Sequence, residues 1–195
     1  MSTTESKNIK VRLDLFENSG FSRGASRAVE AGWFLLSGLL VESWLPGSGW
    51  RRAVLRLFGA QIGSGVVIKP RVRVKFPWRF EVGDNVWIGE RVWIDNLDRV
   101  TIGSNACISQ GAYLCTGSHD WSKQSFDLIT KPIQIGEGAW VAAHSVIAPG
   151  ATLGDASVLT IGSVAIGELA SWTIYSGVPA QPMKKRIIPR TGMSV

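Results

Sequence analysis

Aliphatic residues recur along this chain at intervals of six residues, interrupted by two steps of eight residues and one of 21. Every repeating position holds Ile, Val or Leu, and several are followed directly by glycine. The positions are Ile62, Ile68, Val74, Val82, Ile88, Ile94, Ile102, Ile108, Leu114, Ile135, Val141, Ile147, Leu153 and Leu159. A six-residue period fits neither an α-helix nor a flat two-faced strand. It predicts a parallel β-helix, in which each short strand ends at a corner whose residue points inward.

A second set of inward-facing positions is expected four residues after the corners. These positions hold mostly valine or alanine: Val66, Val72, Val86, Val92, Ala106, Ala112, Ala139 and Ala151. Three hexapeptides close one triangular coil, and the backbone N–H and C=O groups of each coil pair with the coils on either side. Because no single coil buries its own core, stability is expected to come from the stack.

The step of 21 residues, from Leu114 to Ile135, takes a segment out of the stack. This excursion, residues 115–134, carries the run Gly117-Ser118-His119-Asp120-Trp121. A long loop on a rigid scaffold is a usual place for function. One domain is expected, with three regions. They are an N-terminal extension with capping helices (1–60), the β-helix with its excursion loop (61–167), and a C-terminal strand with a basic tail (168–195).

Residues 28–45, ahead of the repeats, predict an apolar helix that ends at Pro46-Gly47-Ser48-Gly49, and residues 50–58 predict a second short helix. The apolar run of the first helix is too short to span a bilayer. Two interpretations, which do not exclude each other, remain open for it. It caps the open end of the β-helix core, or it lies on a membrane surface with help from nearby arginines. These arginines are Arg23, Arg27, Arg51, Arg52 and Arg56.

The formal net charge of +6 is unevenly spread, with +3 in residues 1–60, +2 in 61–100, −3 in 101–180 and +4 in 181–195. Basic ends indicate anionic partners, such as cofactor phosphates, a nucleotide sugar or a membrane surface. Nucleic acid is disfavoured because the basic residues form no single stripe and no recognition motif is present. The two cysteines, Cys107 and Cys115, indicate no disulfide framework, and residues 1–20 lack a signal-peptide apolar region. A cytoplasmic location is therefore predicted.

The chain has two histidines, His119 in the excursion and His144 within the repeat. Histidine is the side chain best matched to proton transfer near neutral pH, so His119 is a candidate catalyst; the alternative is an exposed loop histidine. His144 is expected at the surface or facing another subunit because it lies in a regular repeat. Two histidines cannot build a three-histidine zinc site unless another ligand type contributes. We therefore expect no metal and disfavour the β-helical carbonic anhydrases.

One coil with its two-residue insertion is 20 residues long. This length places Asp95 and Asn96 one coil below the point near Cys115 where the His119 loop departs. The acid and the amide then lie near the imidazole and bind substrate, or they form a polar pair that faces solvent. Either Asp95 or Asp120 could orient the imidazole ring.

The hexapeptide repeats occur together with three further motifs. These are the loop Cys115-Thr116-Gly117-Ser118-His119-Asp120, the run Ile135-Gly136-Glu137-Gly138-Ala139-Trp140-Val141 and the ending Gly177-Val178-Pro179-Ala180. In this combination the chain resembles the left-handed β-helix acetyltransferases, and within them it is most similar to the colanic acid (exopolysaccharide) biosynthesis subfamily. The resemblance covers about residues 50–190. It implies a mainly β fold, a left-handed parallel β-helix, a homotrimer with active sites between subunits, and acetyl-CoA as co-substrate.

In such enzymes the loop histidine is the general base that deprotonates a sugar hydroxyl, which attacks the acetyl-CoA thioester directly. The resemblance assigns that role to His119. The candidate contacts of the sugar are Asp95, Asn96, Asp120 and Trp121. Backbone N–H groups around Ala142 and Ala143 are candidates for stabilising the oxyanion.

The resemblance also places the pantetheine arm of CoA along the outer face of the later coils. The matching positions are Ala142, Ala143, Ile161, Ile166, Gly167, Val178, Pro179 and Ala180, with Lys184 and Lys185 close to the CoA phosphates. Alternatively, these lysines form a solvated basic tail. The chain departs from its relatives at Ile166-Gly167, where they often have Thr-Lys, and at Gln181, where they often have Lys or Arg. The outward tryptophans Trp87, Trp93 and Trp140 are expected at the trimer interface.

The leading interpretation is an acetyl-CoA-dependent O-acetyltransferase of bacterial exopolysaccharide biosynthesis. Its acceptor is a glycan or a lipid-linked sugar, met in the cytoplasm or at the inner face of the membrane. A second interpretation is an N-acetyltransferase, or an enzyme that acetylates serine or a xenobiotic. A third is a non-catalytic β-helix scaffold, supported only by the departures at Ile166, Gly167 and Gln181.

Overall fold

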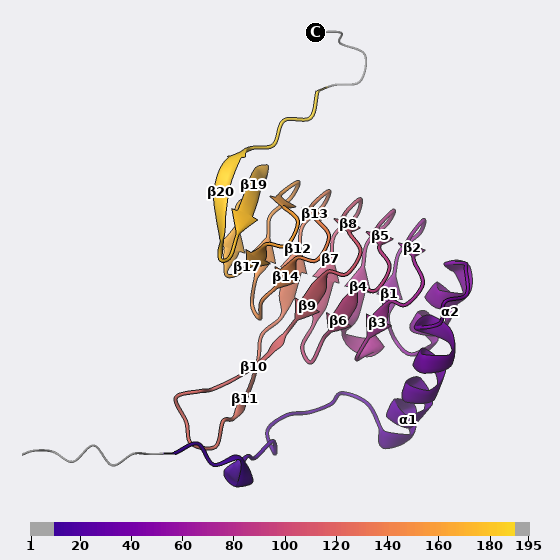
Figure 1. Ribbon diagram of the computed structural model, residues 1–195. Coiled ribbons are helices and arrows are strands. Elements are labelled where there is room, and N and C mark those ends of the chain that lie inside the picture. Colours follow the sequence, from indigo (N-terminus) through magenta and orange to yellow (C-terminus); the bar gives the residue numbers. More distant parts are fainter. Residues whose placement is uncertain (1–9, 190–195) are drawn as a thin grey trace, which may run out of the picture.

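The computed structural model describes residues 10–189, and its centre is a stack of parallel coils (Figure 1). Three sheets form the sides of the stack, and their strands are parallel except for β20 at the edge of the second sheet. The first contains β1 (Gln61–Ile62), β4 (Phe80–Val82), β7 (Val100–Ile102), β12 (Ile133–Ile135), β15 (Thr152–Leu153) and β18 (Glu168–Leu169). The second contains β2 (Val67–Ile68), β5 (Trp87–Ile88), β8 (Cys107–Ile108), β13 (Trp140–Val141), β16 (Val158–Leu159), β19 (Thr173–Gly177) and β20 (Ala180–Lys185). The third contains β3 (Arg73–Val74), β6 (Trp93–Asp95), β9 (Tyr113–Cys115), β14 (Val146–Ile147) and β17 (Val164–Ala165).

The register of the sheets follows the aliphatic repeat. Ile62 pairs with Val82, Val82 with Ile102, and Ile102 with Ile135 across the excursion. All of the predicted corner residues are buried, and so are the valines and alanines four positions later. The predicted parallel β-helix and both sets of inward positions are confirmed.

Two helices cover the first coil. The helix α1 (Arg27–Leu36) continues as a π-helical turn, η2 (Ser37–Val41), and α2 (Gly49–Leu57) follows. Three residues of this cap, Trp33, Val41 and Leu55, are buried in the same core cluster as the β-helix. The capping interpretation is therefore confirmed. No helix within residues 10–189 has the length and apolar character needed to cross a bilayer.

The arginines of the cap mostly bind backbone carbonyls. Arg51 is fully buried, and its guanidinium donates to the carbonyls of Val41, Ser43 and Leu45 at 3.1, 2.9 and 2.6 Å. Burial lowers the pKa of this guanidinium. Arg56 donates to the carbonyl of Ile62 at 2.6 Å. The suggestion that Arg51 assists a membrane contact is wrong, because its guanidinium is enclosed within the cap. Its hydrogen bonds link α2 to the end of η2 and the residues that follow it.

The excursion forms an antiparallel hairpin of β10 (Gly117–His119) and β11 (Leu128–Thr130), which extends away from the stack (Figure 1). The N-terminal segment, with the short 3₁₀ turn η1 (Leu13–Leu15), reaches this hairpin: the Arg12 N–H donates to the Gln124 carbonyl at 2.8 Å. A second 3₁₀ turn, η3 (Pro77–Arg79), fills the two-residue insertion between β3 and β4. At the opposite end, β19 and β20 close the stack as an antiparallel pair.

Candidate active site

His119 lies at the outer end of β10, and one backbone carbonyl fixes its ring. The Nδ1 atom is 2.7 Å from the carbonyl oxygen of Phe126. A carbonyl can only accept a hydrogen bond, so Nδ1 carries the proton in this contact. In the neutral ring, Nε2 then has a free lone pair and can accept a proton.

Two aromatic rings enclose the imidazole. The Phe126 ring stacks on it, with centroids 4.3 Å apart and planes 5° from parallel. On the N-terminal segment, Phe16 approaches at 5.9 Å with a 56° tilt. The imidazole is therefore half-buried, and its rotation is restricted by the stacking ring and by the Nδ1 hydrogen bond.

Neither candidate carboxylate contacts the His119 ring. Asp120 accepts hydrogen bonds from the N–H of Ser122 at 3.0 Å and from its hydroxyl. The hydrogen bond from the Ser122 hydroxyl lowers the pKa of Asp120. The prediction that Asp120 or Asp95 orients the imidazole is wrong, because the Phe126 carbonyl occupies Nδ1. The neighbouring Trp121 is 82% exposed and so is accessible to a ligand.

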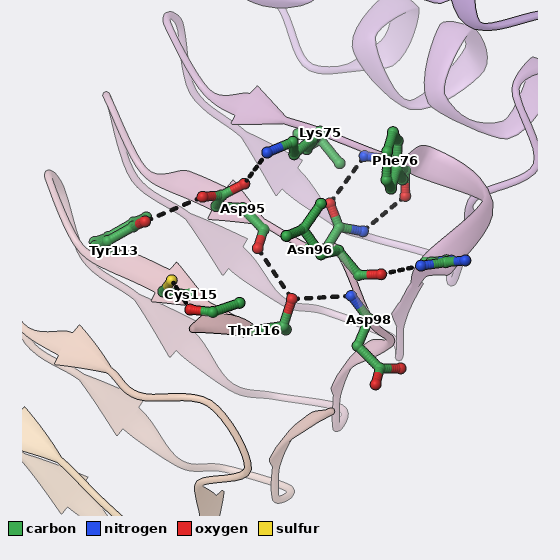
Figure 2. Close-up of polar contacts among 12 residues, drawn as sticks. Lys75, Phe76, Asp95, Asn96, Asp98, Tyr113, Cys115 and Thr116 are labelled. Carbon is green, nitrogen blue, oxygen red and sulfur yellow. Dashed lines mark hydrogen bonds and ion pairs between the residues drawn. The ribbon is translucent and has the colours of Figure 1, made fainter. Parts of the chain in front are cut away.

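Asp95 pairs in register with Cys115, as the 20-residue coil predicts. Figure 2 shows its carboxylate between two partners: Lys75 Nζ lies 2.9 Å from Oδ1, and the Tyr113 hydroxyl donates to Oδ2 at 3.1 Å. Burial raises the pKa of the Tyr113 hydroxyl, which favours its role as a donor. Asp95 therefore has a fixed position one coil from the base of the hairpin.

Asn96 is fully buried, so the solvent-facing alternative is wrong for it. Its Oδ1 accepts from the Phe76 N–H at 2.9 Å and its Nδ2 donates to the Phe76 carbonyl at 2.7 Å (Figure 2). The predicted contact of Asn96 with a sugar does not fit this geometry, because the amide is already paired and enclosed. Its role is to join two successive coils beneath the hairpin.

The backbone amides of Ala142 and Ala143 differ in availability. The Ala142 N–H donates to the Leu159 carbonyl at 2.9 Å, so it is excluded as an oxyanion donor. Within residues 10–189 the Ala143 N–H meets no acceptor, and the Ala143 carbonyl accepts from Gly162 at 3.0 Å. Only the Ala143 N–H therefore remains a candidate oxyanion donor.

The predicted CoA positions divide between two corners of the stack. Ile161 lies one coil after Ala143, at the same corner. Two residues further along the chain, the Ser163 hydroxyl accepts a hydrogen bond from the Gly177 N–H at 3.0 Å. The exposed Val178 follows Gly177 directly. Ala142, Pro179 and Ala180 belong to this same corner and its closing hairpin. By contrast, Ile166 and Gly167 lie at the next corner, beyond β17.

The two lysines lie on β20 and are exposed, so this basic segment is an ordered strand whose lysines face solvent. Lys185 Nζ donates to the Thr173 hydroxyl at 3.1 Å. No side-chain hydrogen bond or ion pair to another described residue involves Lys184.

His144 is exposed in a left-handed conformation with φ 56°, which confirms the predicted surface position. The exposed tryptophans Trp87 and Trp140 flank Cys107 in one column of the second sheet. Trp93 instead lies half-buried on the third sheet, stacked on Tyr113. No group of three or more His, Cys, Asp or Glu residues in the described part of the chain could hold a metal ion.

No family model matches the chain, but its sequence is similar to those of curated acetyltransferases. The chain is 39% identical over 170 residues to a protein of Escherichia coli K12 assigned as colanic acid biosynthesis acetyltransferase WcaF, covering 86% of this chain and 92% of that protein. It is 26% identical over 138 residues to the E. coli K12 galactoside O-acetyltransferase, covering 69% and 68%.

Among solved structures, the chain is similar to the hexapeptide-repeat acetyltransferase VCA0836 of Vibrio cholerae in complex with acetyl-CoA. The TM-score is 0.76 at 25% identity, and the match covers 85% of this chain and 92% of that one. A galactoside acetyltransferase in complex with coenzyme A shares the fold, with a TM-score of 0.70 at 22% identity over 83% and 84% of the two chains.

Proposed function

This chain belongs to the hexapeptide-repeat acetyltransferases of the colanic acid biosynthesis type, and on that basis we propose that it acetylates a sugar hydroxyl with His119 as the general base. The chain is an acyltransferase whose co-substrate is acetyl-CoA. The orientation of His119 carries the proposal about the base. With Nδ1 donating to the Phe126 carbonyl, Nε2 is the nitrogen left to accept a proton.

The proposed reaction is one direct transfer. Nε2 of His119 takes the proton of the sugar hydroxyl as its oxygen attacks the thioester carbonyl carbon. The carbon–sulfur bond then breaks, the acetyl group stays on the sugar oxygen, and the proton on the imidazolium passes to the departing CoA sulfur. No acetylated protein group forms, so neither Cys107 nor Cys115 serves as a nucleophile.

The donor is proposed to lie along the corner that contains Ala143. Negative charge develops on the thioester oxygen during attack, and the unpaired Ala143 N–H can stabilise it. Ile161 and Val178 give this corner an exposed apolar surface for pantetheine. Lys184 and Lys185 on β20 are the proposed partners of the CoA phosphates, in place of the basic residues absent at Ile166-Gly167 and Gln181.

We propose that three chains assemble into a homotrimer with a site between neighbouring subunits. The column of Trp87, Cys107 and Trp140 on the second sheet exposes two tryptophans, and aromatic residues are enriched at protein interfaces. In a threefold ring this face meets a different face of the next subunit. The hairpin that carries His119 extends from the stack, so it can reach a neighbour (Figure 1).

The product distinguishes this proposal from N-acetylation. Incubation with acetyl-CoA and a panel of neutral and amino sugars is expected to yield a sugar ester that alkali cleaves, with one CoA thiol released per ester. An amide product, which withstands the same alkali, would instead support the amino-sugar alternative, since both reactions need the same base and donor.

We also propose that the outer face of the cap contacts the inner face of the cytoplasmic membrane, where a lipid-linked acceptor would be met. Trp33, Ser37 and Val41 form the buried stripe of α1 and η2, while Leu35 and Leu39 face the other way and are 63% and 70% exposed. Other exposed apolar residues of the cap are Phe34, Trp44, Leu45 and Leu57. Residues 10–60 carry seven basic and four acidic side chains, a net charge of +3 that suits anionic headgroups.

Liposome flotation tests the membrane contact. Replacing Leu35 and Leu39 with serine is expected to weaken binding to vesicles containing anionic lipid by about tenfold for each leucine, because each loses an insertable apolar side chain. The matched control is Ile187→Ser, which removes an 84% exposed aliphatic residue at the opposite end of the stack. If the double variant floats as well as the wild type, or if its only change is in oligomeric state, the membrane proposal is wrong.

A further inference from the structure

A cavity of about 590 Å³ lies between α1 and the outer face of the first two coils. Its lining combines charged and aromatic side chains: Arg23, Arg27, Glu30, Glu42, Arg73, Lys75 and Asp95 with Trp33, Phe34, Phe76, Trp78 and Trp93. The volume falls in the range of small-molecule sites. The third sheet forms one wall of the cavity, and α1 forms the other.

Three ion pairs lie in this lining. Arg23 Nε is 2.7 Å from Glu30, Arg73 Nε is 3.4 Å from Glu42, and Lys75 Nζ is 2.9 Å from Asp95. In each pair the basic side chain is about half exposed, so the pairs contribute little to folding stability. Their terminal groups are therefore available to a ligand at little cost to the fold.

One charge in the cavity has no internal partner. Arg27 makes no ion pair with any carboxylate of the described chain. The lining thus has four cations and three carboxylates, a surplus of one positive charge. A ligand with one negative group would balance this surplus, and Arg27 can bind a carboxylate or phosphate through two parallel N–H groups.

The remaining lining gives the cavity rigid aromatic walls with one open ring, Phe34. Phe76 stacks on Trp78 with centroids 5.1 Å apart, and Trp93 is covered by the Arg73 guanidinium at 4.7 Å. These contacts fix the rings, while Phe34 remains largely exposed at the edge. Asp95 Oδ1 receives no directed hydrogen bond, since the Lys75 contact is an ion pair outside hydrogen-bond angles. Paired cations and carboxylates around aromatic rings offer hydroxyl groups both donors and acceptors.

The cavity is close to the proposed base but does not include it. Asp95 lines the cavity and pairs in register with Cys115, and His119 follows Cys115 four residues later in the sequence. Adding one inter-strand spacing to four extended residues gives at most about 19 Å between the Cα atoms of Asp95 and His119. A neighbouring unit of the same glycan can therefore reach the cavity while another unit is at His119.

We propose that this cavity binds an acidic sugar unit of the acceptor glycan, with its single anionic group on Arg27 and its hydroxyls on the paired side chains around Asp95 and Glu30. The inference rests on the proposed sugar acetylation and adds a specificity site to it. It makes the enzyme select an acidic glycan while His119 acts on a nearby hydroxyl.

The test is a binding titration followed through the indole N–H signals of the protein. The probes are methyl β-glucuronide, its neutral counterpart methyl β-glucoside, and the 6-phosphate of that glucoside. The wild type is expected to bind an anionic probe about tenfold more tightly than the neutral one. Arg27→Gln removes the preference, whereas Arg99→Gln, which removes another exposed arginine, just before β7 and paired with Glu81, keeps it. The stronger of the two anionic probes identifies the charged group as carboxylate or phosphate.

Equal affinity for charged and neutral probes would overturn the proposal, as would an unchanged preference in Arg27→Gln. Acetyl-CoA binding, measured on the same samples, separates this result from the proposed function. If the wild-type protein binds acetyl-CoA but does not prefer an acidic sugar, the proposed sugar site in the cavity is wrong and the proposed function stands. Wild-type protein that binds no acetyl-CoA refutes the proposed function.

Discussion

Replacing His119 with alanine is expected to lower the rate of acetyl transfer by about 10²- to 10⁴-fold. The variant loses the nitrogen proposed to accept the hydroxyl proton, so attack would begin from a neutral alcohol. Acetyl-CoA affinity and oligomeric state are expected to stay near the wild-type values, because within residues 10–189 the ring packs on Phe126 and Phe16 at the outer end of the hairpin. Release of CoA thiol at saturating donor and acceptor measures the rate, and calorimetry measures donor binding.

The chain's other histidine provides the control. His144→Asn removes an exposed imidazole, and asparagine tolerates the left-handed backbone at this position, φ 56°. This variant is expected to transfer acetyl groups at nearly the wild-type rate. A rate for His119→Ala within a few-fold of the wild-type rate would show that His119 is not the base.

Replacing Asn96 with alanine is expected to lower the free energy of unfolding by about 2–5 kcal/mol. In the wild type the Asn96 side chain pairs with both the N–H and the C=O of Phe76. The substitution leaves these two backbone groups buried without hydrogen-bond partners. It also opens a cavity between two coils beneath the hairpin that carries His119. Denaturant unfolding at a fixed protein concentration measures the change.

Gln134→Ala is the matched control for Asn96. It removes an exposed amide side chain that makes no side-chain hydrogen bond to the described residues, and its effect is expected within about 0.5 kcal/mol. If Asn96→Ala unfolds at the same denaturant concentration as this control, the amide is not the link between the coils. An unchanged affinity for acetyl-CoA in folded Asn96→Ala would support a structural role over a catalytic one.

The repeat in the sequence was sufficient to predict the scaffold. Each corner residue fills the same kind of buried position, so the aliphatic residues recur with the spacing of the corners along the chain. The 20-residue coil length also predicted the pairing of Asp95 with Cys115, because register in a stacked sheet follows from counting residues. The long step after Leu114 marked the hairpin for the same reason.

The details of the candidate site could not be predicted in this way. The group that orients His119 is a backbone carbonyl, which every residue has, so no side chain in the sequence signals it. Asn96 was recognised as a polar residue near the hairpin, but its burial depends on a turn 20 residues earlier that presents Phe76 to it. Phe16 reaches the imidazole from more than 100 residues away, along a segment with no repeat to set its position.

The cavity beside α1 depends on packing between segments that the repeat does not relate. Arg27 belongs to a helix, and Asp95 belongs to the second coil. They line the same cavity because Trp33, Val41 and Leu55 pack against the core and so fix the position of the cap. Apolar periodicity predicted that a cap would exist, but not which charged side chains it would place against the third sheet.

A single-turnover experiment tests direct acetyl transfer to a sugar hydroxyl most directly. Enzyme in excess is mixed with acetyl-CoA labelled in the acetyl group and with the acceptor sugar, then quenched at successive times. The label is expected to pass from acetyl-CoA to an alkali-labile sugar ester, with no labelled protein at any time. Labelled protein that forms and decays before the ester, such as a thioester on Cys115, or label recovered only as an alkali-stable amide, would contradict it.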